Sequence, residues 1–490
     1  MEDSPEVLIA SDTAGDSKGR GRQRNSVVND VHSRLNETRV SEVMKPRTLS
    51  DLQATVAAAS RSGMKISVMG GRHAMGGQQF ATDSVLIDMK GLNQLLSFDH
   101  ENGRAEVEAG AIWPEFTAAY LKAQEHKPVQ WGFAQKQTGA DDLSLGGTLA
   151  ANGHGRGLRM QPFGSDVESF TLVDAESRII FCSRTENPEL FALVVGGYGL
   201  FGIVYSVKLR LVKRTKIQRV VEVRSLQGLM SAFEQRIGEG CLYGDFQFAI
   251  DPKSDDFLKR GVFSCYRPVD DDMAMPANVA ELSDESWRTL LYLAHGDKAE
   301  AFRQYSEYYL STNGQLYWSD THQMSIYPAG YHDEIDRKSE AEHKATEIIT
   351  EIDVPYSELE FFLAEAREDF RKNNVDLIYG TVRLIERDQD SFLPWAKQPY
   401  ACTIFNLHTM HTEDGLEHSA AGFRRLTDMA MRRGGNYFLT YHRFARRDQV
   451  LACYPQFPEF LKLKKKYDPG ELFQSDWYRH YRSMFRGELL

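Results

Sequence analysis

Three glycine-rich segments, joined by predicted strands, lie in the N-terminal half of the chain. They are residues 70–77, 146–155 and 196–202, and all of them fall within about 140 residues. Glycine lets the backbone approach a flat ligand closely and adopt conformations that other residues avoid. Three such approaches in one region indicate a single extended, flat ligand. A dinucleotide fits this pattern, whereas a small metabolite does not.

Two of the segments match nucleotide-binding motifs only in part. Residues 197–202 match G-x-G-x-x-G, but a predicted helix precedes them and a predicted strand follows, which reverses the order of a Rossmann fold. Residues 71–78 have Walker A spacing, but Gly77 and Gln78 replace the lysine and the hydroxyl residue that hold phosphate and magnesium. The loop at 70–78 still offers free N–H groups, which can hold a diphosphate without a metal.

The chain divides into four parts that differ in composition and in their predicted helices and strands. Residues 1–38 are expected to form a flexible tail, since they open as a Ser-, Gly-, Asp- and Arg-rich stretch. Residues 39–214 alternate predicted strands with short helices. Residues 215–440 are predicted to be a second α+β domain with a mostly antiparallel sheet flanked by helices, and residues 441–490 are expected to pack back on the first domain. Helices are predicted near 52–60, 113–127, 287–310, 359–372, 420–433 and 457–466, and strands near 65–68, 85–87, 203–212, 246–250, 377–385 and 403–407.

Composition narrows the classes of function. The chain has 58 Lys and Arg against 69 Asp and Glu, and this net charge of −11 lacks the positive footprint of a nucleic-acid-binding protein. The five cysteines form no C-x-x-C pair, so we expect no metal motif and a reducing compartment. The N-terminus lacks an apolar signal region, and glycines interrupt the uncharged stretch 191–207, so we expect no secretory signal and no membrane span. These features indicate a cytoplasmic protein with a small-molecule substrate, of unknown oligomeric state.

Several segments, taken jointly, resemble one enzyme family. They are GGRHAMGGQ at 70–78, LIDM at 86–89, VEAG at 107–110, LGGTLA at 145–150, the stretch 191–204, and YDP at 467–469. In this the chain resembles the FAD-linked oxidoreductases of the vanillyl-alcohol oxidase family, which carry a PCMH-type FAD-binding domain. GHG at 153–155 and FQSD at 473–476 are especially similar to alditol and aldonolactone oxidases and to decaprenylphosphoryl-ribose oxidase. The first loop also looks like that of cytokinin dehydrogenase.

The resemblance implies a two-subdomain FAD-binding domain and FAD as the cofactor. It implies that the first loop and the segment from Ser144 wrap the FAD diphosphate and isoalloxazine, and that the backbone of Ile203 holds the flavin. In many members a histidine at the place of His73 is bonded covalently to the flavin 8α-methyl. Here Ala74 follows, where the family usually has Ser, so covalent and non-covalent binding both stay open. The cofactor-binding residues implied are Gly70, Gly71, Arg72, His73, Ala74, Gly76, Gly77, Gln78, Ser144, Gly146, Gly147, Thr148, Asn152, Gly202 and Ile203.

The resemblance also suggests catalytic residues. Arg383 lies on the predicted strand 377–385, in a stretch similar to the one where alditol oxidase keeps a catalytic arginine, but Thr381 stands at the place of its paired glutamate. Tyr441 and His442 lie in a segment that resembles the one carrying a catalytic lysine in relatives, and His442 is expected to titrate near neutral pH. His154 is expected close to the flavin and substrate.

Three functions remain open from the sequence. The first is an FAD-dependent oxidase or dehydrogenase that acts on a CH–OH group of a sugar, polyol or lactone by hydride transfer to flavin N5, with oxygen or another acceptor reoxidising the flavin. The second keeps FAD but is a non-covalent reductase or a prenyl-phospho-sugar oxidase. The third is an FAD-fold protein that has lost its catalytic activity.

Overall fold

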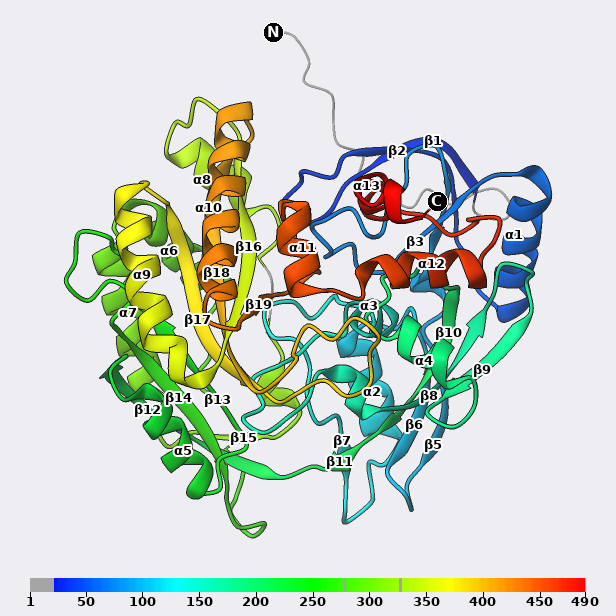
Figure 1. Cartoon of the computed structure of the whole chain (residues 1–490). Coiled ribbons are helices and arrows are strands. Elements are labelled where there is room, and N and C mark those ends of the chain that lie inside the picture. Colours follow the sequence, from blue (N-terminus) through cyan, green and yellow to red (C-terminus); the bar gives the residue numbers. More distant parts are fainter. Residues whose placement is uncertain (1–21, 277–278, 326–327, 490) are drawn as a thin grey trace, which may run out of the picture.

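The structure is a computed structural model that describes residues 22–276, 279–325 and 328–489. Helices and strands are mixed in an N-terminal part, with two larger sheets and one two-stranded sheet, and in a second part built on one large sheet (Figure 1). No helix in the described part of the chain is both long and apolar enough to cross a membrane.

The first sheet has four strands in the order β1-β2-β4-β3. Strands β2, β4 and β3 run parallel to one another, whereas β1 pairs antiparallel with β2. Helix α1 connects β2 to β3, and the side chain of Thr48 caps it by accepting a hydrogen bond from the backbone of Asp51 at 3.1 Å. The elements are β1 (Arg22–Val28), β2 (Thr38–Met44), α1 (Leu49–Ser62), β3 (Ile66–Met69) and β4 (Val85–Asp88).

Strand β1 corrects the expected extent of the flexible tail. A tail was expected to run to residue 38, but ordered structure already begins at Arg22. The reason is tertiary: the backbone of β1 pairs with the edge of β2, and Val28 packs against a cluster that includes Val40 and Phe80. Residues 1–21 of the expected tail lie outside the described residues.

The second sheet has five antiparallel strands in the order β5-β6-β10-β8-β9. Strand β10 follows the third glycine segment directly, as predicted, and lies at the centre of this sheet. The elements here are β5 (Leu95–Asp99), β6 (Arg104–Glu108), α2 (Trp113–Ala123), β7 (Trp131–Gly132), α3 (Leu145–Ala151), β8 (Val167–Val173), β9 (Ile179–Ser183), α4 (Pro188–Val194), β10 (Ile203–Arg210) and β11 (Val212–Lys213).

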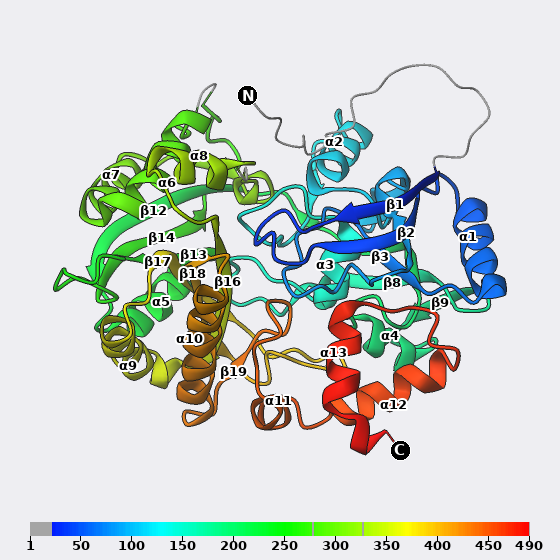
Figure 2. The same ribbon diagram turned by 90° about the horizontal axis from the view of Figure 1, so that it is seen from above.

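The large sheet has eight strands in the order β15-β12-β14-β13-β17-β18-β16-β19, and every neighbouring pair is antiparallel. Figure 2 shows α6, α7 and α8 on one side of it and α5, α9 and α10 on the other. The strands are β12 (Lys216–Ser225), β13 (Tyr243–Phe248), β14 (Arg260–Pro268), β15 (Leu316–Trp318), β16 (Ala345–Val354), β17 (Leu377–Ile385), β18 (Tyr400–Met410) and β19 (Asn436–Tyr437). The helices are α5 (Leu229–Gly238), α6 (Asp284–Gly296), α7 (Lys298–Ser311), α8 (Tyr331–Lys338), α9 (Leu359–Lys372) and α10 (Glu413–Met431).

One helix predicted in this region is wrong. A single helix was expected near 287–310, but two helices meet at Asp297. The side chain of Asp297 accepts a hydrogen bond from the backbone N–H of Glu300 at 3.0 Å and thereby caps α7. A short polar residue that caps a new helix ends the old one, which a pattern of apolar spacing does not reveal.

Two of the C-terminal helices, α12 (Phe457–Tyr467) and α13 (Asp476–Met484), lie against the first domain (Figure 1). Helix α11 (Arg447–Cys453) instead packs against α10. The backbone of Ile66 in β3 donates to Leu472 at 2.8 Å and accepts from Gln474 at 2.7 Å. The C-terminal segment therefore extends the edge of the first sheet.

A buried ion pair fixes the turn after α12. The ammonium of Lys464 and the carboxylate of Asp468 are 0% and 1% exposed and form a hydrogen bond. Asp468 also accepts hydrogen bonds from the backbone N–H groups of Leu472 and Phe473, each at 2.9 Å. Burial lowers the pKa of Lys464 to about 8. The pair thus joins α12 to the strand-like segment that contacts Ile66.

Removing the carboxylate of this pair should destabilise the protein. In Asp468→Asn the ammonium of Lys464 stays buried without a counter-charge, and we expect the free energy of unfolding to fall by about 3–5 kcal/mol. Urea unfolding followed by circular dichroism measures this change. The control Glu189→Gln breaks an exposed ion pair, in which the side chains of Glu189 and Lys466 are 47% and 58% exposed. It should lower the free energy of unfolding by no more than about 1 kcal/mol. An equal loss of unfolding free energy in both variants would contradict a special stabilising role for the buried pair.

Candidate cofactor and substrate site

A cavity of about 500 Å³ is lined by both parts of the molecule. One wall comes from the three glycine-rich segments and from the residues that flank them. The other comes from β13, β16, β17 and β18 of the large sheet, together with α6 and α7. Segments that are distant in the sequence therefore share one chamber.

The first glycine segment packs closely against residues 142–144, which lead into the second glycine segment. A Cβ atom on Gly71 would lie 2.0 Å from the carbonyl oxygen of Asp142, and one on Gly70 would lie 2.0 Å from Oγ of Ser144. Arg72 has a positive φ of 60°. The backbone N–H groups of residues 71–74 find no acceptor among the described residues. Consecutive free N–H groups around a left-handed residue form a concave anion site, so this loop fits the diphosphate of a dinucleotide.

Most of the residues predicted to bind a cofactor line this cavity. Gly76, Gly77 and Asn152 do not. Asn152 instead ends α3 in a left-handed conformation, and its buried side chain bridges Asp388 at 2.9 Å and the backbone of Gly164 at 2.8 Å. Its role in the structure is to hold a helix end. The predicted residues in the lining are Gly70, Gly71, Arg72, His73, Ala74, Gln78, Ser144, Gly146, Gly147, Thr148, Gly202 and Ile203.

Gly76 and Gln78 connect the first loop to the C-terminal part. The side-chain amide of Gln78 donates to the carbonyl of Thr440 at 2.8 Å, and its Oε1 accepts from the backbone of Gly76 at 2.9 Å. A Cβ on Gly76 would lie 2.2 Å from the carbonyl oxygen of Tyr441. This end of the loop therefore positions the segment that carries Tyr441.

His73 lies on the cavity wall beside a second histidine. Its Nδ1 is 2.8 Å from Nε2 of His32. Burial lowers the pKa of His73 to about 2 and that of His32 to about 4. Both imidazoles are therefore neutral at physiological pH, and Nε2 of His73 is the ring nitrogen left to react. Sequence analysis missed His32, because it lies in a stretch that was assigned to the tail.

Tyr441 belongs to a buried relay of three polar groups. Its hydroxyl donates to Oε2 of Glu351 at 3.1 Å, and the other oxygen of Glu351 lies 2.7 Å from Nε2 of His154. Tyr441 lines the cavity, whereas His154 lies behind it with its ring against Trp395. Burial raises the pKa of Tyr441 well above its usual value. The phenol therefore stays protonated and acts as a hydrogen-bonding group. Glu351 was missed, because one carboxylate in a strand carries no motif.

His442 does not reach the cavity. Its ring stacks on Phe444 at 5.0 Å between centroids, and burial lowers its pKa to about 4. The expectation that it titrates near neutral pH is therefore wrong. The burial that lowers this pKa arises from tertiary packing, which is not visible in the sequence around residue 442.

Arg383 is one of several polar groups on the sheet wall. Arg383, Asp245 and Gln247 all line the cavity. Nε of Arg383, Oδ1 of Asp245 and Oε1 of Gln247 are buried and have no hydrogen-bond partner among the described residues. Buried polar groups without partners are costly, so these atoms indicate a polar ligand that completes them. Asp245 and Gln247 are polar residues within the buried strand 243–248, and this is a signal that sequence analysis overlooked.

Comparisons with known proteins agree with this geometry. Residues 40–183 match the FAD binding domain family. The chain is similar to L-gulono-1,4-lactone dehydrogenase of Mycobacterium tuberculosis, with 22% identity over 453 residues that cover 90% of this chain and 95% of that protein. It is also similar to an uncharacterized oxidoreductase of the fasciation locus of Rhodococcoides fascians (32% identity, 34% of this chain) and to cytokinin dehydrogenase 2 of Arabidopsis thaliana (28% identity, 34% of this chain).

The last two similarities span about a third of the relatives' length, 37% and 32% respectively. The match to the FAD binding domain family covers 144 residues, from 40 to 183. Residues 40–183 thus form an FAD binding domain, and through it the chain is related to FAD-linked oxidoreductases.

Proposed function

We propose that this chain is an FAD-dependent oxidoreductase that oxidises a CH–OH group of a sugar, polyol or lactone. The supporting observation is the shared cavity: one wall carries backbone N–H groups of the first glycine loop, the other carries buried polar side-chain atoms, and neither set has a hydrogen-bond partner among the described residues. Bound FAD supplies the acceptor for the hydride that leaves the substrate carbon. The protein supplies the binding site, the orientation and the path for the hydroxyl proton.

The sheet wall binds and orients the substrate. The guanidinium of Arg383 donates hydrogen bonds, whereas the free oxygens of Asp245 and Gln247 accept them. A polyhydroxylated substrate offers donors and acceptors in equal measure, so its hydroxyl groups match this set. An apolar substrate would leave all of these atoms unsatisfied, at a cost of about 1–3 kcal/mol for each.

Tyr441 and Glu351 take the proton of the reacting hydroxyl. The phenol oxygen of Tyr441 accepts a hydrogen bond from that hydroxyl while the phenol donates to Glu351. As the hydride leaves, the substrate proton moves to the tyrosine oxygen and the phenol proton moves to Oε2 of Glu351. His154 holds the other carboxylate oxygen and orients the relay.

The same arrangement supports a proposed role for each domain. Residues 39–214 form the FAD-binding domain, whose two sheets correspond to two subdomains. Residues 215–440 form the substrate domain, and residues 441–490 return to the first domain. A prenyl-phospho-sugar is the second candidate substrate, because α6 and α7 add the apolar side chains of Trp287, Leu290 and Phe302 to the cavity wall.

A panel of substrates tests the function. Under anaerobic conditions we expect aldonolactones, sugars or polyols to bleach the flavin absorption of the purified protein, because hydride transfer reduces it. Amines should leave the absorption unchanged. Admission of air then shows whether oxygen restores the colour. Bleaching by prenyl-phospho-sugars alone would favour the second candidate, and bleaching by no compound would favour a protein without catalytic activity.

Substitution of Tyr441 tests the relay. In Tyr441→Phe the path for the hydroxyl proton is lost, so we expect kcat to fall about 100-fold or more while the flavin content stays unchanged. Stopped-flow reduction measures the loss. The matched control is Tyr120→Phe, since Tyr120 also donates to a buried carboxylate, that of Asp320 at 2.6 Å, but does not line the cavity. An equal decrease in both variants would show that the effect is general.

We also propose that His73 is bonded covalently to the flavin. Its imidazole is neutral, and the contact with His32 occupies Nδ1, so Nε2 is the nucleophile. The new N–C bond replaces one hydrogen of the 8α-methyl group. His73 would lose its imidazole N–H proton, and bound FAD together with molecular oxygen would accept the two electrons, with hydrogen peroxide as the reduced product.

Acid denaturation tests this bond. We expect the yellow colour to stay with the precipitated polypeptide, and we expect His73→Ala to release it into solution. His126→Ala changes an exposed histidine and should keep the colour bound. Complete release of flavin from the unsubstituted protein would contradict covalent attachment and leave the rest of the site intact.

A further inference from the structure

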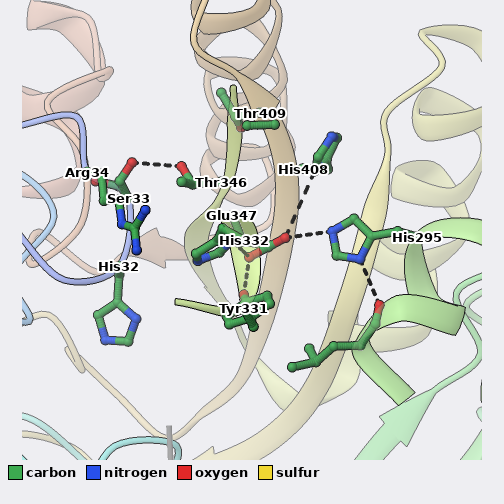
Figure 3. A network of polar contacts seen from close by, with 12 residues as sticks. His32, Ser33, Arg34, His295, Tyr331, His332, Thr346, Glu347, His408 and Thr409 are labelled. Carbon is green, nitrogen blue, oxygen red and sulfur yellow. Dashed lines mark hydrogen bonds and ion pairs between the residues drawn. The ribbon is translucent and has the colours of Figure 1, made fainter. Parts of the chain in front are cut away.

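A cluster of imidazoles surrounds one buried carboxylate on the large sheet, apart from the glycine loops (Figure 3). Glu347 lies on β16 directly opposite His408 on β18. His295 reaches the same carboxylate from the last turn of α6. The side chains of Glu347, His295 and His408 are 4%, 11% and 24% exposed. Three secondary-structure elements thus direct polar atoms at one point.

The tautomer of His295 follows from its contacts. Its Nδ1 lies 2.7 Å from the carbonyl oxygen of Leu291, which can only accept a hydrogen bond. Nδ1 therefore carries a hydrogen, and in the neutral ring Nε2 carries a lone pair. That lone pair faces Oε1 of Glu347 at 2.8 Å. Two lone pairs at this distance repel each other unless a positive charge lies between them.

His408 brings a third lone-pair atom to the same point. Its Nδ1 is buried, has no hydrogen-bond partner among the described residues, and lies 3.9 Å from Oε1 of Glu347. The three atoms, Nε2 of His295, Nδ1 of His408 and Oε1 of Glu347, all lie within 4.8 Å of one another. A proton on His295 would satisfy its contact with Glu347 but would leave His408 without a partner. A divalent cation would satisfy all three.

The other oxygen of Glu347 is already held in place. Oε2 accepts the hydroxyl of Tyr331 and lies 2.9 Å from Nδ1 of His332. Such outer contacts orient a metal ligand, as does the contact of His295 with a backbone carbonyl. Figure 3 shows Tyr331 and His332 beside Glu347, on the opposite side from His295. Oε1 is therefore the carboxylate oxygen that remains for a metal.

We propose that His295, His408 and Glu347 bind one divalent transition metal of the zinc class. Two imidazole nitrogens and one carboxylate oxygen are a donor set that zinc prefers, whereas magnesium and calcium prefer oxygen ligands alone. Three protein ligands leave a fourth position open. Glu347 and His332 line the cavity, which gives the metal a route to the site. No spacing motif joins residues 295, 347 and 408, so the site is invisible in the sequence.

Calorimetric titration of the purified protein with zinc chloride, after dialysis against EDTA, tests the site. We expect saturable binding of one zinc per chain and no binding of magnesium. Glu347→Gln and His408→Gln should each weaken the affinity at least 10-fold, because each removes one ligand. His418→Asn changes an exposed histidine on α10 and should bind zinc as the unsubstituted protein does.

Two results would overturn the proposal. One is the absence of saturable zinc binding, which would leave a protonated imidazole as the positive charge in the cluster. The other is equal zinc affinity in His408→Gln and in His418→Asn. If Glu347→Gln fails to fold, His408→Gln still tests the site. Nδ1 of His408 has no hydrogen-bond partner among the described residues, so its loss breaks no hydrogen bond of the fold. Circular dichroism and flavin content show which variants are folded.

Discussion

Close contact between residues 70–71 and 142–144 determines the shape of the N-terminal wall of the cavity. A Cβ on Gly71 would overlap the backbone of Asp142, and one on Gly70 would overlap the side chain of Ser144, so this approach requires glycine at both positions. The backbone N–H groups that follow, at residues 71–74, find no acceptor among the described residues. Backbone N–H groups without a partner are unfavourable where the chain is partly shielded from water. They are therefore best explained by a ligand with negative charge, such as a diphosphate.

Gln78 links this loop to the chain segment that carries Tyr441. Its amide donates to the backbone of Thr440, next to Tyr441, and its carbonyl oxygen holds Gly76 in the loop. The phenol of Tyr441 then reaches Glu351 on the large sheet. In the proposed function, Gln78 and the segment of Tyr441 would thus relate a cofactor held by the loop to a substrate held by the sheet. Proximity of this kind matters because hydride transfer requires the two reacting atoms to be in contact.

The sequence could predict what depends on local patterns. The glycine loops, helix 359–372 and strand 377–385 follow from spacing and alternation, and they match the structure. His32 and Glu351 could not be found in this way, because each acts through a partner that is distant in the chain. Asn152 shows what a motif leaves out: the resemblance implied a contact with the cofactor, whereas the structure shows a left-handed helix end with a buried side chain bonded to Asp388.

Strand β16 carries both polar centres of the large sheet. Glu347 and Glu351 are four residues apart, so their side chains point to the same face, and at about 3.3 Å per residue they are separated by roughly 13 Å. Each carboxylate is held by histidine, Glu347 by His295 and Glu351 by His154. The strand lies between β18 and the short β19, and Ile349 between the two acids lines the cavity. The same alternation that builds the sheet therefore places one carboxylate at the relay of Tyr441 and the other at the imidazole cluster.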